Sequence, residues 1–146
     1  MFVSDILAAK SRPLITAIES TTIPEAMSLL LQHRISCLLV VDEQQRLAGL
    51  VSDKDIFRLV HEEPKGFMHH TVGDVMTKKL FTALPSDPLH HVAALMTTHR
   101  IRHIPVVDND RAIGLVSIGD VVKSQLDSME FENKHLRKYI DGDYPA

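Results

Sequence analysis

The segment Gly49-Leu50-Val51-Ser52-Asp53-Lys54-Asp55 recurs later in the chain as Gly114-Leu115-Val116-Ser117-Ile118-Gly119-Asp120, at an offset of 65 residues. Working outward, residues 38–42 match residues 104–108 at an offset of 66. The offset changes once, in the polar loop that precedes the quoted segment. A repeat of this kind indicates that one structural unit has been duplicated and that one loop residue was then deleted.

Each copy has the sequence pattern of a βαββα unit. A short extended stretch at residues 14–18, or 81–84 in the second copy, precedes a helix. In the first copy that helix opens on Thr22-Ile23-Pro24-Glu25, which has the form of a capping box. A continuous apolar run follows and indicates a strand buried on both faces. A polar loop, a second strand and another helix complete the unit. The sequence therefore predicts an α/β protein of the α+β type.

The linker around Pro64 separates the two copies, because proline ends the preceding helix. We assign residues 1–62 to the first repeat, 63–70 to the linker, 71–125 to the second repeat and 126–146 to a C-terminal helix extension and tail. A short helix at residues 71–77, matching residues 3–7, leads into the second copy and has a packing role.

The last helix is predicted to run from Ile118 to Ile140, where Gly142 is placed to terminate it. One small unit cannot cover a helix of this length, so it offers a self-association surface or folds back over its own domain. Its incomplete apolar stripe consists of Val122, Leu126, Met129, Leu136 and Tyr139.

Composition excludes several classes of function. Of the 146 residues, 45% are hydrophobic and 24% are charged, and the formal net charge is −3 without a block of five like charges. Such a chain lacks the basic footprint of a nucleic-acid-binding protein. No apolar run reaches membrane-spanning length and the first residues do not resemble a signal peptide. We therefore expect a cytoplasmic protein without membrane or nucleic-acid partners. The single cysteine, Cys37, is expected to be a buried, inert thiol.

The pattern Gly-x-x-Ser-x-x-Asp is the feature that points to a function. By itself, Ser52 with Asp55, or Ser117 with Asp120, is an ordinary helix N-terminal cap. Here the pattern follows a strand and recurs at the same place in both copies. Each copy also carries a threonine on its first strand, and this combination favours a ligand site at the start of each last helix.

Over residues 3–125 the chain resembles the tandem cystathionine β-synthase (CBS) domain pair, also called the Bateman module. The doubled motif and the run Arg100-Ile101-Arg102-His103-Ile104-Pro105-Val106-Val107-Asp108 carry the resemblance. It implies two βαββα repeats in a pseudo-twofold sandwich with two clefts. In this family the clefts bind adenosine-containing ligands, among them AMP, ADP, ATP, S-adenosylmethionine and sometimes NAD.

The resemblance also implies roles for individual residues. Asp55 and Asp120 would accept hydrogen bonds from ribose hydroxyls, and the helix starts at Ser52 and Ser117 would face phosphate oxygens. Arg102 and His103 stand where the family often places phosphate-contacting side chains. Arg34 and Arg100 follow the first helices, where an arginine contacts phosphate or caps the helix C-terminus. The full set of candidate nucleotide-binding residues is Ile15, Thr16, Ser52, Asp55, Thr82, Arg100, Arg102, His103, Ile104, Pro105, Ser117, Ile118, Gly119 and Asp120.

The two clefts are not expected to be equivalent. Ser36 and Cys37 hold the positions that correspond to Arg102 and His103, so one cleft lacks this cationic pair. We predict one strong site and one weak or empty site, and the sequence does not fix which aspartate serves the strong one. Family geometry often pairs the first strand of one copy with the motif of the other, which would set Thr16 beside Ser117 and Asp120.

The leading hypothesis is a sensor that binds an adenine nucleotide, AMP first, and signals to an unidentified effector protein as a homodimer. No nucleophile lies beside a plausible base and no glycine-rich phosphate loop occurs, so an enzyme is not expected. The histidine pairs at 69–70 and 90–91 lack familiar ligand spacing, so no metal is predicted and these side chains are expected to be solvated. Two alternatives stay open: a structural dimerisation or adaptor module with vestigial clefts, and a nucleotide-hydrolysing or nucleotide-transferring enzyme.

Overall fold

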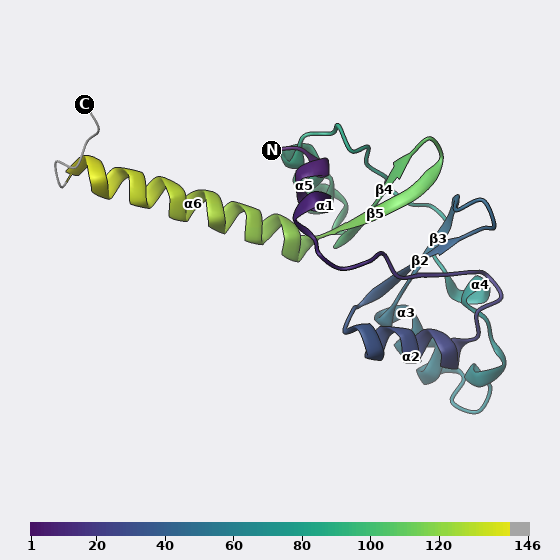
Figure 1. Ribbon diagram of the computed structural model, residues 1–146. Helices are drawn as coiled ribbons and strands as arrows, with labels where there is room; N and C mark the ends of the chain where they lie inside the picture. The colour runs from purple at the N-terminus through teal and green to yellow at the C-terminus, as the bar shows by residue number, and fades with distance from the viewer. Residues whose placement is uncertain (141–146) are drawn as a thin grey trace.

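The computed structural model describes residues 1–140, which form two small α+β halves and one long projecting helix (Figure 1). The elements in chain order are α1 (Val3–Ala9), β1 (Thr16–Ala17), α2 (Ile23–His33), β2 (Cys37–Val41), β3 (Leu47–Ser52), α3 (Asp53–Glu62), η1 (Phe67–His69), α4 (Val72–Val75), α5 (Leu89–His99), β4 (His103–Asp108), β5 (Arg111–Ser117) and α6 (Ile118–Ile140). This order confirms the duplicated unit.

The first copy holds a three-stranded sheet of order β1-β2-β3, with β1 parallel and β3 antiparallel to β2. Every residue of β2 is buried, as its continuous apolar run predicts. The capping box at α2 is confirmed: the Glu25 amide donates to Thr22 Oγ1 (3.3 Å), and the Thr22 amide donates to the Glu25 carboxylate (3.2 Å).

The second copy has a two-stranded sheet, β4-β5, and its predicted first strand is reduced to one parallel bridge between Ala83 and Val106. Thr16 pairs with Leu39 in the first copy, and the residue equivalent to Leu39 is Pro105. Proline has no N–H to donate, so one hydrogen bond of the ladder is lost. This explains why the expected strand at residues 81–84 is shorter than its counterpart.

The leading helices α1 and α4 are exchanged between the two copies. The Val3 amide donates to Asp87 O (2.9 Å), and the Val72 amide donates to Thr21 O (2.8 Å). Both valines are fully buried, Val3 in the core of the second copy and Val72 in the core of the first. The packing role predicted for both segments is therefore confirmed, but each helix serves the other copy.

Each glycine of the repeated motif makes room for an exchanged segment. A Cβ at Gly114 would lie 2.5 Å from Leu7 Cδ2, on α1. A Cβ at Gly49 would lie 2.7 Å from Met76 Sδ and 2.9 Å from Thr77 O, just after α4. At these distances a Cβ would force its neighbour to shift, so the motif glycine belongs to the packing of the fold.

Helix α6 has the predicted limits, and its C-terminal part projects away from both halves (Figure 1). Val121 and Ser124 are buried, whereas the side chains described from Gln125 onward are exposed. The helix therefore does not fold back over its own domain. Gly142 and the side chain of Tyr139 lie outside the described parts. No helix within residues 1–140 combines the length and apolarity needed to cross a membrane.

Candidate functional site

Both repeated motifs form capping boxes at the starts of α3 and α6. The Asp55 amide donates to Ser52 Oγ (3.2 Å) and the Ser52 amide donates to Asp55 Oδ2 (2.9 Å). The same two bonds join Ser117 and Asp120, at 3.2 Å and 2.8 Å. In each copy the cap uses Oδ2 of the aspartate. The helix-capping interpretation of the motif is thus correct. A ligand that hydrogen-bonds to either aspartate must use the acceptor positions of the carboxylate that the cap leaves free.

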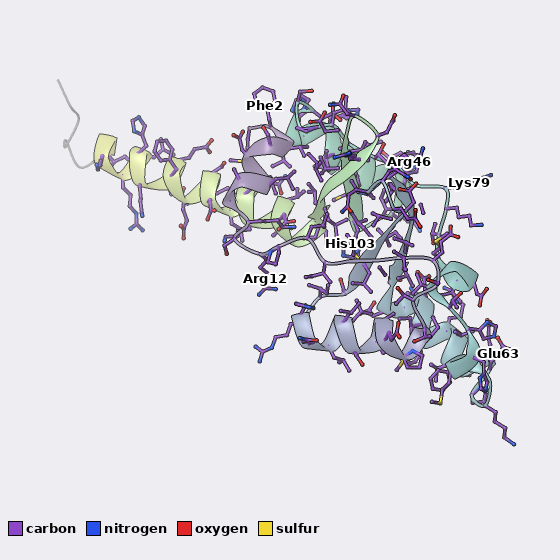
Figure 2. The ribbon with its side chains drawn as sticks, turned by 45° about the vertical axis from the view of Figure 1, so that its right-hand side comes forward. Phe2, Arg12, Arg46, Glu63, Lys79 and His103 are labelled. Carbon is purple, nitrogen blue, oxygen red and sulfur yellow. The ribbon has the colours of Figure 1, made fainter. Side chains whose placement is uncertain are left out.

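A cleft of about 1000 Å³ lies around Asp120, between the two copies. Its walls come from the segment that joins α1 to β1, the end of α2 and start of β2, strand β5 and the first turns of α6. Figure 2 shows Arg12 on the first of these segments and His103 near it. Its polar lining residues include Lys10, Arg12, Arg34, Ser36, His103, Ser117, Asp120 and Lys123.

The cleft is positively charged although the chain as a whole is negative. Among residues 1–140, four lysine and arginine side chains line it, those of Lys10, Arg12, Arg34 and Lys123, against the single carboxylate of Asp120. The formal charge of the whole chain is −3. Clefts lined by one sign of charge concentrate ligands of the opposite sign. The lining therefore favours an anionic ligand.

Lys10 binds directly to the motif aspartate. Its Nζ lies 2.7 Å from Asp120 Oδ2 and donates to Leu115 O at 2.6 Å. Burial raises the pKa of Asp120, but the hydrogen bonds from Lys10 and the Ser117 amide outweigh that effect and hold the pKa below its usual value. Asp120 is therefore ionised at neutral pH.

His103 lies in the middle of the molecule, where its Nε2 is 3.0 Å from Ser36 Oγ. Burial lowers the pKa of His103, the main cause of its shift, so the ring is neutral at pH 7. Arg102 is exposed and is not among the residues that line the Asp120 cleft. The expected cationic pair is therefore not present in this cleft, because Arg102, the residue before β4, does not line it and burial discharges the histidine.

The structure brings together only part of the predicted set. Ile15, His103, Ser117 and Asp120 line one cleft, so the segment that leads into the first strand of one copy lies across from the motif of the other. Ten predicted residues do not line it: Thr16, Ser52, Asp55, Thr82, Arg100, Arg102, Ile104, Pro105, Ile118 and Gly119. Thr16, which was expected beside Ser117 and Asp120, begins β1 directly after Ile15, and Ile104 is packed in the core of the second copy. Arg100 and Arg34 both occupy the left-handed C-cap position of a helix, at φ 53°.

The sequence reasoning missed the cations of this cleft. No motif in the sequence points to Lys10, Arg12 or Lys123, and Arg34 is offered only as a phosphate contact or a helix cap, outside the predicted set. The only signal for the first two was the basic stretch Lys10-Ser11-Arg12 ahead of the first strand. Lys123 follows Asp120 by three residues, so it lies on the same face of α6.

The surroundings of Asp55 differ from those of Asp120. Among residues 1–140, no lysine, arginine or histidine lies within ion-pair distance of Asp55. The backbone near the two motifs is otherwise alike. The Asp53 amide donates to Ser36 O, and the Ile118 amide donates to Arg102 O, both at 2.8 Å.

Other candidate residues have structural roles. Cys37 is buried, as expected, and burial raises the pKa of its thiol to about 12, which disfavours the reactive thiolate. His70 is not simply solvated, because its Nε2 lies 2.9 Å from Glu63 and its Nδ1 3.1 Å from Asp74. The two acids bind opposite nitrogens, and no cluster of metal-ligating side chains occurs within residues 1–140.

The family model described as the CBS domain matches residues 3–62 and 72–127, which together make up most of the chain. The chain belongs to the CBS domain family. The tandem pair inferred from the doubled motif is thereby confirmed, and so is the α+β fold with a C-terminal helix.

Similar proteins include the mitochondrial CBS domain-containing protein CBSX3 of Arabidopsis thaliana, which is 35% identical over 97% of this chain and 73% of its own length. Among solved structures, the CBS domain pair of MJ0100 in complex with 5′-methylthioadenosine and S-adenosyl-L-methionine is 34% identical, with a TM-score of 0.75. The match covers 89% of this chain and 98% of that one. CBSX2 in complex with AMP is 29% identical, with a TM-score of 0.76, over 88% and 98% of the two chains.

These similarities bear on the expected ligand-binding role, on the expectation that the protein is not an enzyme, and on the expected location. The family includes pairs that bind adenosine-containing ligands, so this chain is similar to regulatory ligand-binding modules. Other relatives are enzymes in which the matched part is about a fifth of the whole. The cytoplasmic location stays a prediction, since the Arabidopsis relative CBSX3 is mitochondrial.

Proposed function

We propose that the protein is a regulatory module that binds an adenosine-containing nucleotide, with AMP as the first choice, in the cleft around Asp120. The observation that carries the proposal is the placement of Ser117 and Asp120 in a wide, positively charged cleft formed by both copies. Asp120 would accept hydrogen bonds from the ribose hydroxyls, and the N-terminus of α6 with Ser117 would face the phosphate. The ligands of MJ0100 and CBSX2 support an adenosine-containing ligand.

The cleft around Asp120 is our candidate for the stronger of two sites. Its cations come from segments outside the repeated motif, which compensates for Ser36 and Cys37 standing in place of Arg102 and His103. A second site at Ser52 and Asp55, with Thr82, Arg102 and Pro105, would be the weaker one.

The proposal is tested by thermal denaturation of the purified protein with AMP, ADP, ATP, NAD, S-adenosylmethionine and 5′-methylthioadenosine. A ligand present at 100 times its Kd stabilises the folded state by about 2.7 kcal/mol, which raises the unfolding midpoint by roughly 5 to 10 °C. The Asp120→Asn variant keeps a capping oxygen but loses the charge, so this rise should shrink.

Asp55→Asn is the matched control, because the same cap at the other motif is changed. No rise with any ligand at millimolar concentration, in protein free of co-purified nucleotide, would favour the ligand-free adaptor instead. Chromatography of ATP after incubation with the protein and magnesium addresses the third alternative, since no product is expected from a module that only binds.

Signalling would follow from the position of the cleft between the copies. The segment after α1, the start of β2 and the first turns of α6 all line it, so a bound ligand contacts both halves. A ligand shifts the relative setting of two bodies only if it binds one arrangement more tightly than the other. We propose that an effector protein responds to the relative setting of the two halves.

We also propose that two copies pair through α6. Val122, Leu126, Met129, Leu136 and Ile140 lie along one face at intervals of three, four or seven residues, and each is 46–79% exposed. Asn133 completes this series, a polar residue of the kind that fixes register in a coiled coil. Between residues 127 and 138, acidic side chains precede Asn133 and basic ones follow it, so antiparallel pairing over this part of α6 would set unlike charges side by side.

A further inference from the structure

Lys10 forms an ion pair with the carboxylate of Asp120, which in the proposed function accepts hydrogen bonds from the ribose. It is the C-cap residue of α1, and α1 is held in the second copy by Val3 and Ile6. From this position its ammonium group reaches Asp120 Oδ2 (2.7 Å) and Leu115 O (2.6 Å). The lysine is only about one-third exposed, so this contact is part of the wall of the cleft.

The acceptor capacity of Asp120 makes this contact important for ligand binding. Oδ2 already accepts from the Ser117 amide at 2.8 Å and from Lys10. A carboxylate oxygen has two lone-pair directions, so both are in use. Two ribose hydroxyls would therefore have to share Oδ1 unless Lys10 moved. A ribose that uses both carboxylate oxygens of Asp120 requires the lysine to leave Oδ2.

A displaced ammonium group requires another anion in this cleft. Arg12, Arg34 and Lys123 also line the cleft, and within residues 1–140 Asp120 is its only lining carboxylate. A neutral adenosine derivative would leave Lys10 with the Leu115 carbonyl but without an anionic partner, among like charges. A 5′-phosphate, attached to the same ribose, would give Lys10 a charge-assisted bond in exchange for the one it loses.

We propose that Lys10 is a specificity determinant that exchanges Asp120 for a ligand phosphate, so that the cleft selects nucleoside 5′-phosphates over uncharged adenosine derivatives. This inference rests on the proposed function, because it assumes that Asp120 holds a ribose. It narrows the ligand class to anionic nucleotides and gives the cations outside the motif a role.

The test compares AMP with adenosine by calorimetric titration of the wild-type protein, Lys10→Met and Lys10→Arg. Removing one hydrogen bond to a charged group weakens binding by roughly 10- to 100-fold. Lys10→Met should lower the affinity for AMP by at least roughly 10-fold, while the affinity for adenosine stays the same or rises a few-fold. Lys10→Arg retains the charge and should keep most of the preference. Lys65→Met, in the exposed linker, controls for the loss of a positive charge elsewhere.

The outcomes separate the two proposals. If the wild-type protein binds neither ligand, nor any adenosine-containing ligand in the thermal screen, the proposed function itself is wrong. If Lys10→Met weakens the binding of AMP and of adenosine equally, Lys10 supports the shape of the cleft and does not select phosphate. If Lys10→Met strengthens the binding of both ligands, Lys10 only blocks access of the ribose to Asp120. Either of the last two results would overturn the inference, provided that the unfolding midpoint of the ligand-free variant shows it to be folded.

Discussion

The two copies of the repeat carry the same motif but differ at the place where an exchanged helix ends. In the first copy, α4 stops at Val75, and the backbone of Thr77 pairs with that of Leu50 at 2.8 and 3.0 Å. In the second copy, α1 continues to Ala9, so the side chain of Lys10 reaches Leu115 O and also Asp120. A few more helical residues thus place an ammonium group on one motif aspartate and not on the other.

The duplication therefore preserved the backbone and packing of the unit, but not the charged residues that line the clefts. The capping boxes, the exchanged helices and the close-packed glycines obey the repeat. The cations that would select a ligand lie outside the repeated motif. Four predictions, in order of decreasing effect, test how far the two copies correspond.

The first prediction concerns the exchange of the leading helices. Val3→Ala and Val72→Ala each remove a fully buried side chain and should each cost about 2 to 3 kcal/mol of unfolding free energy, measured in urea. Hydrogen exchange should locate the loosening in β4 and β5 for Val3→Ala, and in β2 and β3 for Val72→Ala. Loosening of the first copy by Val3→Ala would contradict the exchange.

The second prediction compares the motif glycines. Gly49→Ala places its Cβ 2.9 Å from the Thr77 carbonyl, a backbone atom that pairs with Leu50, whereas Gly114→Ala meets only the end of the Leu7 side chain. Overpacking costs about 1 to 3 kcal/mol, and a side chain can yield more easily than a backbone bridge. Urea denaturation should therefore show the larger loss for Gly49→Ala. Equal losses would mean that the two contacts are equally rigid.

The third prediction concerns the last helices, because α3 ends after 10 residues and α6 continues for 23. Leu136→Glu puts a charge into the exposed apolar stripe and should weaken self-association about 10-fold, or about 1.4 kcal/mol, by sedimentation equilibrium. Phe131→Glu is the control, since Phe131 is 72% exposed on the opposite side of the helix. A monomeric wild-type protein at high concentration would refute pairing through α6.

The smallest expected effect is a dependence of stability on pH at the linker. Hydrogen bonds that His70 donates to Glu63, and then to Asp74, raise its pKa above its ordinary 6.5. A raised pKa means that this stabilisation is complete below pH 6.5 and is lost as pH rises through the folded-state value. The unfolding midpoint should fall more between pH 6 and pH 9 in the wild-type protein than in His70→Gln. Parallel profiles would show that the contact contributes nothing measurable.

Much of the fold could be predicted because its signals are local. The capping box at Thr22, the continuous apolar run of β2 and the limits of α6 each depend on neighbouring residues. The reduced first strand of the second copy could also have been inferred, since Pro105 cannot donate a hydrogen bond at the position of Leu39.

The candidate site was less accessible to sequence reasoning because it depends on distant contacts. Lys10 reaches Leu115 and Asp120, more than 100 residues away, only because α1 packs in the second copy. The neutral state of His103 depends on burial at the junction of the two copies, which no local pattern encodes. Residue type alone therefore misassigned the cations, although it identified Ser117 and Asp120 as the motif to examine.

The central claim, that Asp120 and not Asp55 serves the stronger nucleotide site, is tested most directly by calorimetric titration of AMP into the wild-type protein, Asp120→Asn and Asp55→Asn. We predict one tight site per chain in the wild-type protein, a loss of roughly 10- to 100-fold in affinity for Asp120→Asn, and little change for Asp55→Asn. Unchanged binding by Asp120→Asn together with a loss in Asp55→Asn would contradict the assignment and place the nucleotide in the other cleft.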